Sequence, residues 1–357
     1  MGEHRIAGLL NFIVVAAVGA VAYTDWVIVA DVSLAYLYVL PIALCALVNP
    51  LPFTIALGVV CTFLGDIFGP PAVSLYWRVV HNVVYLASFL VVGFLVTLIA
   101  RQRDRMAEEV RRQRDEYERD LELAAQVQHR VLPRPLSLPG IDIAAEMKTA
   151  RLLGGDYYDF FPVSDDVVDV VIADVSGKGA AAALLMPSLA VALRLRAREL
   201  EGPAQVIADL DGVLKQMTNS ATFVTMFYAR LNRASRILQY ANAGHNPPVL
   251  MRAGSCEALL LEEAGGPILG ILNGAQYSDA SITLGTGDIL TLFTDGVTEQ
   301  ENALGDEFAV DRLKDVICHD GTGSAAEVVA RVSEAVSAFA GETVQADDLT
   351  LVVLKVL

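Results

Sequence analysis

Four long apolar runs fill the first hundred residues of this 357-residue chain. Arg5 and Arg78 are the only Lys or Arg side chains in that stretch, so the runs carry almost no charge. A helix needs about 20 apolar residues to cross the roughly 30 Å hydrocarbon layer of a bilayer. The sequence therefore predicts a transmembrane region over residues 1–100, with four spans near 6–29, 33–48, 52–68 and 79–100.

The positive charges that flank these runs predict their orientation. Arg5 precedes the first run, whereas Arg101, Arg103 and Arg105 follow the fourth. Because basic residues favour the cytoplasmic side, both termini are expected in the cytoplasm, which agrees with four spans. The first run is longer than the apolar core of a signal peptide and three more runs follow it, so we interpret it as a retained helix.

Residues 101–135 form a highly charged segment with nine Arg and eight Asp or Glu. Eight positions within it recur at intervals of 4, 3, 4, 4, 3, 4 and 3 residues. This is a heptad pattern with one additional four-residue step after Tyr117, and it predicts a coiled-coil linker helix, locally unwound at that step, in a parallel homodimer. Pro133 and Pro135 end the helix. The eight positions are Met106, Val110, Gln113, Tyr117, Leu121, Ala124, Gln128 and Val131.

The net charge of −16 comes almost entirely from the C-terminal part, where residues 136–357 hold 15 Lys or Arg against 30 Asp or Glu. A surface this acidic disfavours nucleic acid as a partner, because nucleic-acid binding requires a basic footprint. The four cysteines show no C-x-x-C spacing, so neither a disulfide framework nor a zinc ribbon is expected.

Residues 136–357 have the pattern of a globular α/β domain. Strands and helices come in blocks rather than in strict alternation, which favours packed antiparallel sheets flanked by helices over a doubly wound sheet. Strands are predicted at 167–175, 223–231, 237–241, 289–293 and 349–356. Helices are predicted at 180–200, 203–218, 307–318 and 325–339.

Four acidic clusters lie where strands should begin or end, at residues 154–159, 173–179, 293–296 and 347–350, and the last three adjoin the strands predicted above. Carboxylates that converge at strand ends repel one another and raise each other's pKa values unless a cation lies between them. Hard divalent cations such as Mg²⁺ and Mn²⁺ prefer these oxygen ligands. No His or Cys joins the clusters, which argues against zinc. Two such ions can bind a phosphate group and activate a water molecule.

The sequence around these clusters resembles the bacterial SpoIIE/RsbU-type branch of the metal-dependent (PPM) serine/threonine protein phosphatases. The resemblance covers residues 121–357 and rests on short sequence motifs that occur in the same order as in the family. It implies an αββα sandwich with the metal ions at one edge. The words are AAQVQ followed by LP before the domain, then GGDYYDF (154–160), ADVSGKGAAAALLM (173–186), FVTMFY (223–228), YANAGHNPPVL (240–250), GGPILGI (265–271), LFTDGVTE (292–299) and DDLTLVV (347–353).

The resemblance also implies a site for two Mn²⁺ or Mg²⁺ ions and identifies the residues that bind them. Asp174 corresponds to the aspartate that bridges both ions, and Asp174 and Asp295 are expected to act in catalysis through the metal-bound water. Asp348 is interpreted as a neighbour rather than a ligand. The family usually has Pro-Ala before GGD, whereas this chain has Thr149-Ala150, and Arg151 beside them is a candidate contact for substrate phosphate. The implied ligands are Asp156, Asp174, the Val175 carbonyl, Asp295 and Asp347.

Together with the predicted spans, the resemblance implies a multi-pass phosphatase of the bacterial inner membrane. Its expected substrate is a phosphorylated signalling protein, in this branch an anti-sigma-factor antagonist of the STAS type. Attack is expected from a metal-bridging water in line on phosphorus, without a phosphoenzyme.

Two alternative functions, and the role of one histidine, are considered beside this interpretation. The GGDYY word (154–158) also resembles the GGDEF word of diguanylate cyclases, but that interpretation leaves Asp295 and Asp347 unexplained. A membrane-tethered scaffold with an inactive phosphatase fold is the other alternative. His245, in the word AGHNPP, is interpreted as a residue of a structural turn rather than as a general acid.

Overall fold

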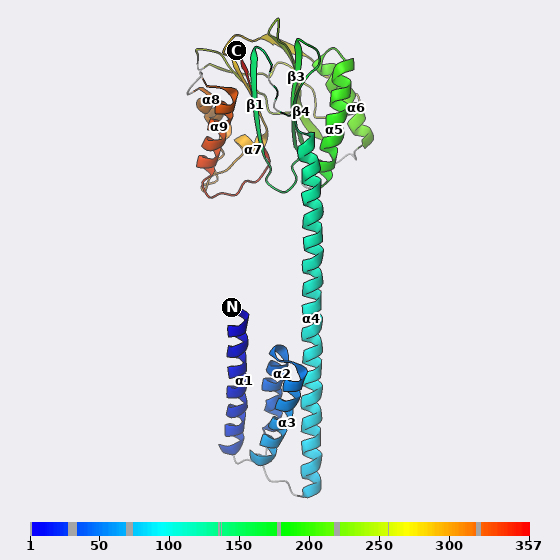
Figure 1. The fold of residues 1–357 in the computed structure, drawn as a ribbon, viewed down its shortest axis with the longest axis vertical. Helices are drawn as coiled ribbons and strands as arrows, with labels where there is room; N and C mark the ends of the chain where they lie inside the picture. The colour runs from blue at the N-terminus through cyan, green and yellow to red at the C-terminus, as the bar shows by residue number, and fades with distance from the viewer. Residues whose placement is uncertain are drawn as a thin grey trace. The chain divides into compact units, whose positions relative to one another are not determined.

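The computed structural model describes residues 2–27, 34–68, 74–134, 136, 138–176, 180–217, 222–255, 257–318 and 323–357. The chain divides into two compact units, Met1–Glu116 and Tyr117–Leu357. One helix, α4 (Leu75–Val131), contributes residues to both units. Figure 1 shows the helices of the first unit and the sheets of the second.

The N-terminal unit is a bundle of apolar helices. Besides the first part of α4 it contains α1 (Gly2–Val27), the short 3₁₀ helix η1 (Ala35–Tyr38), α2 (Val39–Val48) and α3 (Leu51–Phe68). Small residues allow the helices to approach closely, as is common in membrane bundles. A Cβ atom added at Gly65 would lie 2.9 Å from the Ala35 Cβ, and one at Gly93 would lie 2.7 Å from the Thr54 Cγ2.

Among the described residues of this unit, three helices are long and apolar enough to cross a membrane, one fewer than the four predicted spans. The three are Gly8–Val27 within α1, all of α3, and α4. The second predicted span, 33–48, forms only the shorter apolar segment Ala35–Val48. This segment ends at Val48, as predicted, because Pro50 disfavours helical geometry at Asn49, which is extended.

Helix α4 continues without interruption from the fourth apolar run through the charged linker. Three of the predicted coiled-coil positions, Met106, Val110 and Tyr117, are well exposed in the single chain. By contrast, Gln128 is buried and Val131 packs against the core of the second unit. The last part of the predicted seam therefore contacts this chain's own globular unit, while the earlier part remains exposed.

The C-terminal unit contains two five-stranded antiparallel sheets. The first sheet has the order β1-β10-β9-β6-β7 and the second has the order β2-β3-β4-β5-β8. Their facing side chains form a continuous apolar core between the sheets. The strands are β1 (Ile141–Lys148), β2 (Asp156–Pro162), β3 (Val167–Val175), β4 (Val224–Asn232), β5 (Ile237–Ala243), β6 (Val249–Met251), β7 (Ala258–Leu260), β8 (Ala280–Thr283), β9 (Ile289–Phe293) and β10 (Leu349–Val356).

Helices cover the outer face of each sheet. α5 (Ala180–Glu199) and α6 (Pro203–Met217) pack on the second sheet, and α8 (Ala309–Cys318) and α9 (Ala325–Ala340) pack on the first (Figure 1). The four layers are thus helix, sheet, sheet, helix. A capping box between Ser324 and Glu327 fixes the start of α9.

Two buried aspartates attach α5 to the second sheet. Asp159 in β2 accepts hydrogen bonds from Arg194 at 2.7 and 2.9 Å. Asp169 in β3 pairs with Arg230 in β4, which also donates to the carbonyls of Ala197, Leu200 and Glu201 at the end of α5. Because these carbonyls have no partners within the helix, Arg230 acts as its C-terminal cap.

The predicted strands and helices of this unit occur within two residues of their predicted bounds. The short strands β6, β7 and β8 and the first two strands were not predicted. One expectation about cysteine is corrected: Cys318 is disulfide-bonded, whereas Cys45 and Cys61 are free. Cys256 lies outside the described residues.

Candidate metal-binding site

The predicted acidic clusters lie at strand ends of the globular unit. Asp156 begins β2 and pairs directly with Asp174 near the end of β3, because the two strands are antiparallel. In the other sheet, β9 and β10 are antiparallel neighbours. Asp295 follows the end of β9 and Asp347 precedes the start of β10. The topology therefore brings four acids that are far apart in sequence to adjoining strand ends.

Two threonines connect the sheets at this edge through one carboxylate. Asp156 is only 2% exposed, and its Oδ2 accepts hydrogen bonds from Thr294 Oγ1 at 2.8 Å and Thr350 Oγ1 at 2.5 Å. The Thr350 N–H in turn donates to Thr294 Oγ1 at 3.0 Å. Burial raises the pKa of Asp156 well above its ordinary value; the threonine hydrogen bonds oppose this shift, and Asp174 adds to it.

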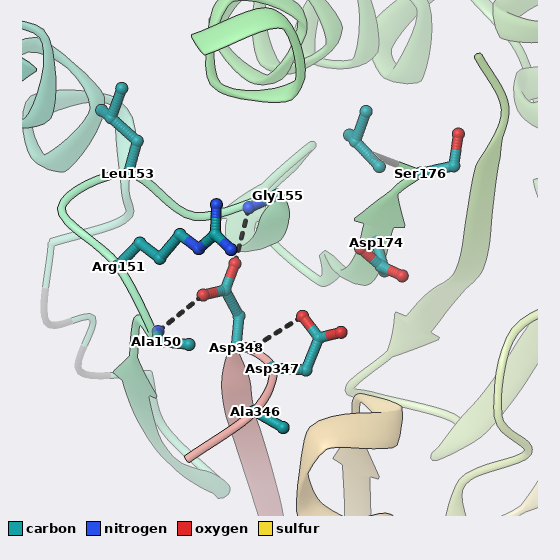
Figure 2. A pocket seen from close by; sticks show the side chains of 10 residues that line it. Ala150, Arg151, Leu153, Gly155, Asp174, Ser176, Ala346, Asp347 and Asp348 are labelled. Atoms are coloured by element: carbon teal, nitrogen blue, oxygen red, sulfur yellow. Dashed lines mark hydrogen bonds between the residues drawn. The ribbon is translucent and has the colours of Figure 1, made fainter. Parts of the chain in front are cut away.

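Asp348 holds the loop that precedes β2. Its Oδ1 accepts the Ala150 N–H at 2.8 Å and its Oδ2 accepts the Gly155 N–H at 2.6 Å, as Figure 2 shows. Asp348 N–H also donates to Asp347 Oδ1 at 2.9 Å. Both oxygens of Asp348 are thus engaged by backbone donors, which supports its interpretation as a bracing residue.

Two glycines at this edge are closely packed, Gly154 against side chains and Gly296 against backbone. A Cβ added at Gly154 would lie 2.7 Å from Thr149 Cγ2 and 2.8 Å from Asp348 Oδ2. A Cβ at Gly296, next to Asp295, would lie 2.0 Å from the Asp348 carbonyl oxygen. The glycines of the GGD and D-G words therefore leave room for the contacts that hold the strand ends together.

A cavity of about 120 Å³ lies among these residues (Figure 2). Asp174, Asp347 and Asp348 line it together with Arg151, the cation predicted to contact phosphate. Figure 2 shows the Arg151 side chain extending over Asp348. Asp156 and Asp295 are not part of the lining. The full lining is Ala150, Arg151, Leu153, Gly155, Asp174, Val175, Ser176, Ala346, Asp347 and Asp348.

The charge of the edge extends beyond the predicted ligands. Asp174, Asp295 and Asp347 are half-buried. The pKa of Glu299, at the end of the short helix α7 (Asp295–Thr298), is raised by burial and by the nearby charges of Asp295, Glu307 and Asp347. Such mutual repulsion is relieved when a cation binds between the carboxylates.

The donor chemistry fits an oxygen-preferring divalent cation. The candidate ligands are carboxylates and one backbone carbonyl, which suit Mg²⁺ or Mn²⁺. Within the described ranges, however, no three His, Cys, Asp or Glu side chains form a group that is already arranged to hold a metal. The edge thus has the charge and the donors for a cation, and the carboxylates must still draw together around it.

His245 lies in the buried loop between β5 and β6, away from the cavity lining. Its backbone N–H donates to Asn242 Oδ1 at 2.7 Å, and Asn242 Nδ2 donates back to the His245 carbonyl at 2.9 Å. The ring Nδ1 lies 2.9 Å from Thr225 Oγ1 in β4. Burial lowers the pKa of His245 to about 4, although the carbonyl of Phe293 favours the protonated form.

We expect His245→Ala to destabilise the fold by about 1–3 kcal/mol, because a buried hydrogen-bonding partner is lost. It should change kcat by less than about tenfold, below the usual general acid–base contribution. The unfolded chain takes up a proton below a pKa of about 6.5 while the folded chain does not until about 4. The stability from neutral His245 is therefore complete above pH 6.5 and is lost as the pH falls towards 4.

Thermal unfolding between pH 4 and 7 checks this expectation. His245→Asn should show a weaker dependence of its unfolding midpoint on pH than the wild type. A thousandfold loss of kcat in a folded His245→Ala protein would instead identify His245 as a general acid.

Some residues of this edge were not predicted as functional from the sequence. Thr294 and Thr350 were overlooked because a threonine beside a buried strand has no local signal, although each adjoins an acidic word. Gln128 was predicted only as a coiled-coil position. It is buried and forms two hydrogen bonds with the backbone of Gly154.

Comparison with known proteins places this geometry among phosphatases. The family described as Stage II sporulation protein E (SpoIIE) matches residues 164–357 of the chain. Phosphoserine phosphatase RsbU of Bacillus subtilis (strain 168) is 33% identical over 241 residues, which cover 67% of this chain and 71% of RsbU. The family match thus contains Asp174, Asp295 and Asp347, whereas Asp156 and Arg151 precede it.

Two solved structures show the same two-sheet fold. The RsbU and RsbW domains of Rv1364c from Mycobacterium tuberculosis align with a TM-score of 0.54 and 29% identity, over 63% of this chain and 63% of that one. The SiaA-PP2C domain of Pseudomonas aeruginosa aligns with a TM-score of 0.58 over 68% of this chain and 98% of that domain. At 20% identity, the second comparison shows the fold alone.

Proposed function

Because the chain belongs to the SpoIIE family of PPM phosphatases, we propose that it is a membrane-bound, metal-dependent phosphatase that hydrolyses phosphoserine or phosphothreonine on a signalling protein. The observation that carries the proposal is the acidic cavity lined by Asp174, Asp347 and Asp348 with Arg151 at its rim. An acidic site repels a phosphate dianion unless cations neutralise it, so the geometry favours metal-dependent phosphate chemistry.

In this proposal five groups hold two Mn²⁺ or Mg²⁺ ions. These are the carboxylates of Asp156, Asp174, Asp295 and Asp347 and the carbonyl of Val175. Bound there, such ions supply an activated water and offset the charge of the phosphate. Thr294 and Thr350 orient Asp156, and Asp348 fixes the loop on which Arg151 lies.

Arg151 is proposed to bind the phosphate oxygens of the substrate. Its side chain is exposed at the cavity, and a guanidinium matches the geometry of phosphate well. Hydrolysis then breaks the bond between phosphorus and the serine or threonine oxygen. The oxygen of water ends on the phosphate, and the departing side-chain oxygen takes up a proton.

The proposed substrate is a phosphorylated anti-sigma-factor antagonist of the STAS type. Support comes from the resemblance of the whole globular unit to the RsbU branch and from the name of RsbU as a phosphoserine phosphatase. An acidic edge with Arg151 beside it suits a phosphate carried on a protein surface, because the described lining supplies few contacts to other parts of a substrate.

We place the chain in the bacterial inner membrane with both termini in the cytoplasm. The long apolar helices α1, α3 and α4 support insertion in the membrane, and the arginines near the start of α1 and after the apolar part of α4 support cytoplasmic termini. Both termini can lie on one side only if the shorter apolar segment Ala35–Val48 crosses as well. The exposed side chains of Met106, Val110 and Tyr117 support a homodimer through α4, since a two-stranded coiled coil would cover them.

The test uses full-length protein in lipid nanodiscs, with a STAS protein phosphorylated on serine as substrate. We expect phosphate release with Mn²⁺ or Mg²⁺ and a loss of more than 100-fold after EDTA treatment, which re-addition of metal reverses, because the nucleophile depends on the ions.

Three controls separate this proposal from the alternatives. p-Nitrophenyl phosphate tests chemistry without protein recognition, and GTP tests for cyclase activity. An absence of phosphate release from both phosphorylated substrates, with the STAS protein still bound, would favour the inactive scaffold. Phosphate release from p-nitrophenyl phosphate alone would support phosphatase activity and reject the STAS protein as the substrate.

A further inference from the structure

One carboxylate of the N-terminal unit is buried with an oxygen that has no partner. Asp25 lies in the last turn of α1 and is 5% exposed. Its Oδ1 accepts the Leu34 N–H at 3.0 Å, whereas its Oδ2 is enclosed and has no hydrogen-bond partner among the described residues. A carboxylate inside an apolar membrane bundle is costly unless its charge is offset, so such a residue often marks a binding site.

A second buried oxygen without a partner lies close to this carboxylate. The Tyr38 side chain at the end of η1 is fully buried, and its hydroxyl also has no hydrogen-bond partner among the described residues. Tyr38 belongs to an apolar cluster against which Val18, Val21 and Ala22 of α1 pack. The hydroxyl is within electrostatic range of Asp25. Two separate helices thus place an unpartnered oxygen near the end of α1.

The end of α1 supplies further oxygens of the same kind. The last four carbonyls of a helix have no partner within that helix, and they carry the negative end of its dipole. The last turn of α1, Thr24-Asp25-Trp26-Val27, contains no basic side chain to offset this charge. At this end of the unit, η1 contacts both α1 and α3 (Figure 1). The Asp25 carboxylate therefore adds negative charge where the helix end already favours a cation.

The arginine of the membrane bundle is engaged by a different aspartate. Arg78 is the only Lys or Arg between Arg5 and Arg101 in the sequence. Its Nε donates to Asp66 Oδ1 at 2.8 Å and its Nη2 to Asp66 Oδ2 at 2.5 Å. Arg78 and Asp66 neutralise each other, so within the described part of the bundle the single negative charge of Asp25 is balanced by a ligand of charge +1.

We propose that Asp25 Oδ2, the Tyr38 hydroxyl and the carbonyl end of α1 form a binding site for a monovalent alkali cation, Na⁺ or K⁺. Carbonyl oxygens and helix C-terminal ends bind these ions in channels and transporters. A charge of +1 neutralises the carboxylate, whereas a divalent ion would leave excess positive charge in apolar surroundings. The bound cation joins α1 to η1. The site does not depend on the phosphatase activity proposed above.

Trp26 provides a reporter next to Asp25, because the chain has only one other tryptophan, Trp77. The test titrates NaCl and, separately, KCl into the full-length Trp77→Phe protein in nanodiscs, with N-methylglucamine chloride keeping the ionic strength constant. We expect a saturable change in Trp26 fluorescence with at least one of the two alkali cations. A response to only one of them identifies the ion that the site selects.

Two variants in this background test the ligand. Asp25→Asn should weaken the apparent affinity by at least about tenfold, because loss of even an outer-shell partner of a metal costs about 10–100-fold. Asp115→Asn, the same change at an exposed position of α4, should respond as its parent does. An equal response in Asp25→Asn would reveal a general effect of salt and overturn the proposal.

Thermal unfolding supplies a second readout. A ligand that binds only the folded state raises the unfolding midpoint as its concentration increases. The wild-type midpoint should therefore rise with the alkali cation relative to N-methylglucamine, and that of Asp25→Asn should not. Tyr38→Phe removes a buried hydroxyl that has no partner, so it should not lower the midpoint without alkali cation, although it should bind the cation more weakly.

The remaining outcomes also decide the matter. If Asp25→Asn does not fold, Tyr38→Phe takes its place, and a cation affinity equal to that of its parent overturns the proposal. Absence of any response to Na⁺ and K⁺ in the parent protein overturns it as well. A response of Trp26 fluorescence to pH but to neither cation would make a proton the occupant of the site instead.

Discussion

Asp174→Asn is expected to reduce phosphate release by more than 100-fold while the globular unit remains folded. Loss of an outer-shell partner of a metal already costs about 10–100-fold, and Asp174 is proposed to be a direct ligand of both ions. Its carboxylate is half-buried opposite Asp156, whose pKa it helps to raise. Neutralising it removes repulsion from the metal-free protein, so the unfolding midpoint without metal should not fall.

The measurement is the initial rate on a phosphoserine protein at saturating Mn²⁺, with circular dichroism to monitor folding. Asp165→Asn provides a matched control, because Asp165 is exposed in the turn at the opposite end of β3. Asp295→Asn should behave as Asp174→Asn does. Turnover within a few-fold of wild type for either Asp174→Asn or Asp295→Asn, once purified, would remove that residue from the proposed ligand set.

Deletion of residues 117–120 is expected to hold the enzyme in one activity state irrespective of the membrane region. Helix α4 is continuous from Leu75 to Val131, and the chain division between the two units falls between Glu116 and Tyr117, where the heptad pattern has its additional step. Removing four residues makes the heptad pattern continuous and turns the two ends of the helix by about 40° relative to each other. The additional step lets the wild-type helix α4 adopt two arrangements of similar energy. The deletion variant, with a continuous heptad pattern, is expected to adopt only one of them.

Deletion of seven residues, 114–120, provides the control for this prediction. It changes the helical phase by only about 20° and should preserve more of the regulation. Both deletions leave residues 121–131, and hence the contact of Gln128 with Gly154, in place. Activity is compared in membranes for wild type and both deletions, with cysteine crosslinking at Met106 and Val110 to detect dimers. Wild-type behaviour of both deletions, or a monomeric full-length protein, would make α4 a passive tether.

The sequence alone determined those features that depend on local patterns. Long apolar runs indicated the helices of the N-terminal unit, because few other structures tolerate so little charge. Buried strands such as 167–175 and 289–293 were predicted with the bounds observed, since both of their faces are apolar. Three of the four acidic motifs were located from the sequence because each directly adjoins a predicted strand.

Local sequence patterns were less informative for elements that are short. The run at 33–48 is as apolar as its neighbours, yet its described helical segment, Ala35–Val48, is shorter than a span. The strands β6, β7 and β8 have only three or four residues each, too few for a period-2 pattern to be recognised.

Only the tertiary structure decided how the candidate site is held together. Thr350 donates to Asp156 across 194 positions of sequence, and Asp348 accepts the N–H of Gly155 across 193. Such pairs are determined by the stacking of two sheets, which no local periodicity records. Gln128 is a second example. Its spacing in the sequence predicts a position in a seam between helices, whereas in the fold its side-chain amide forms hydrogen bonds with the N–H and the carbonyl of Gly154, beside the acidic edge.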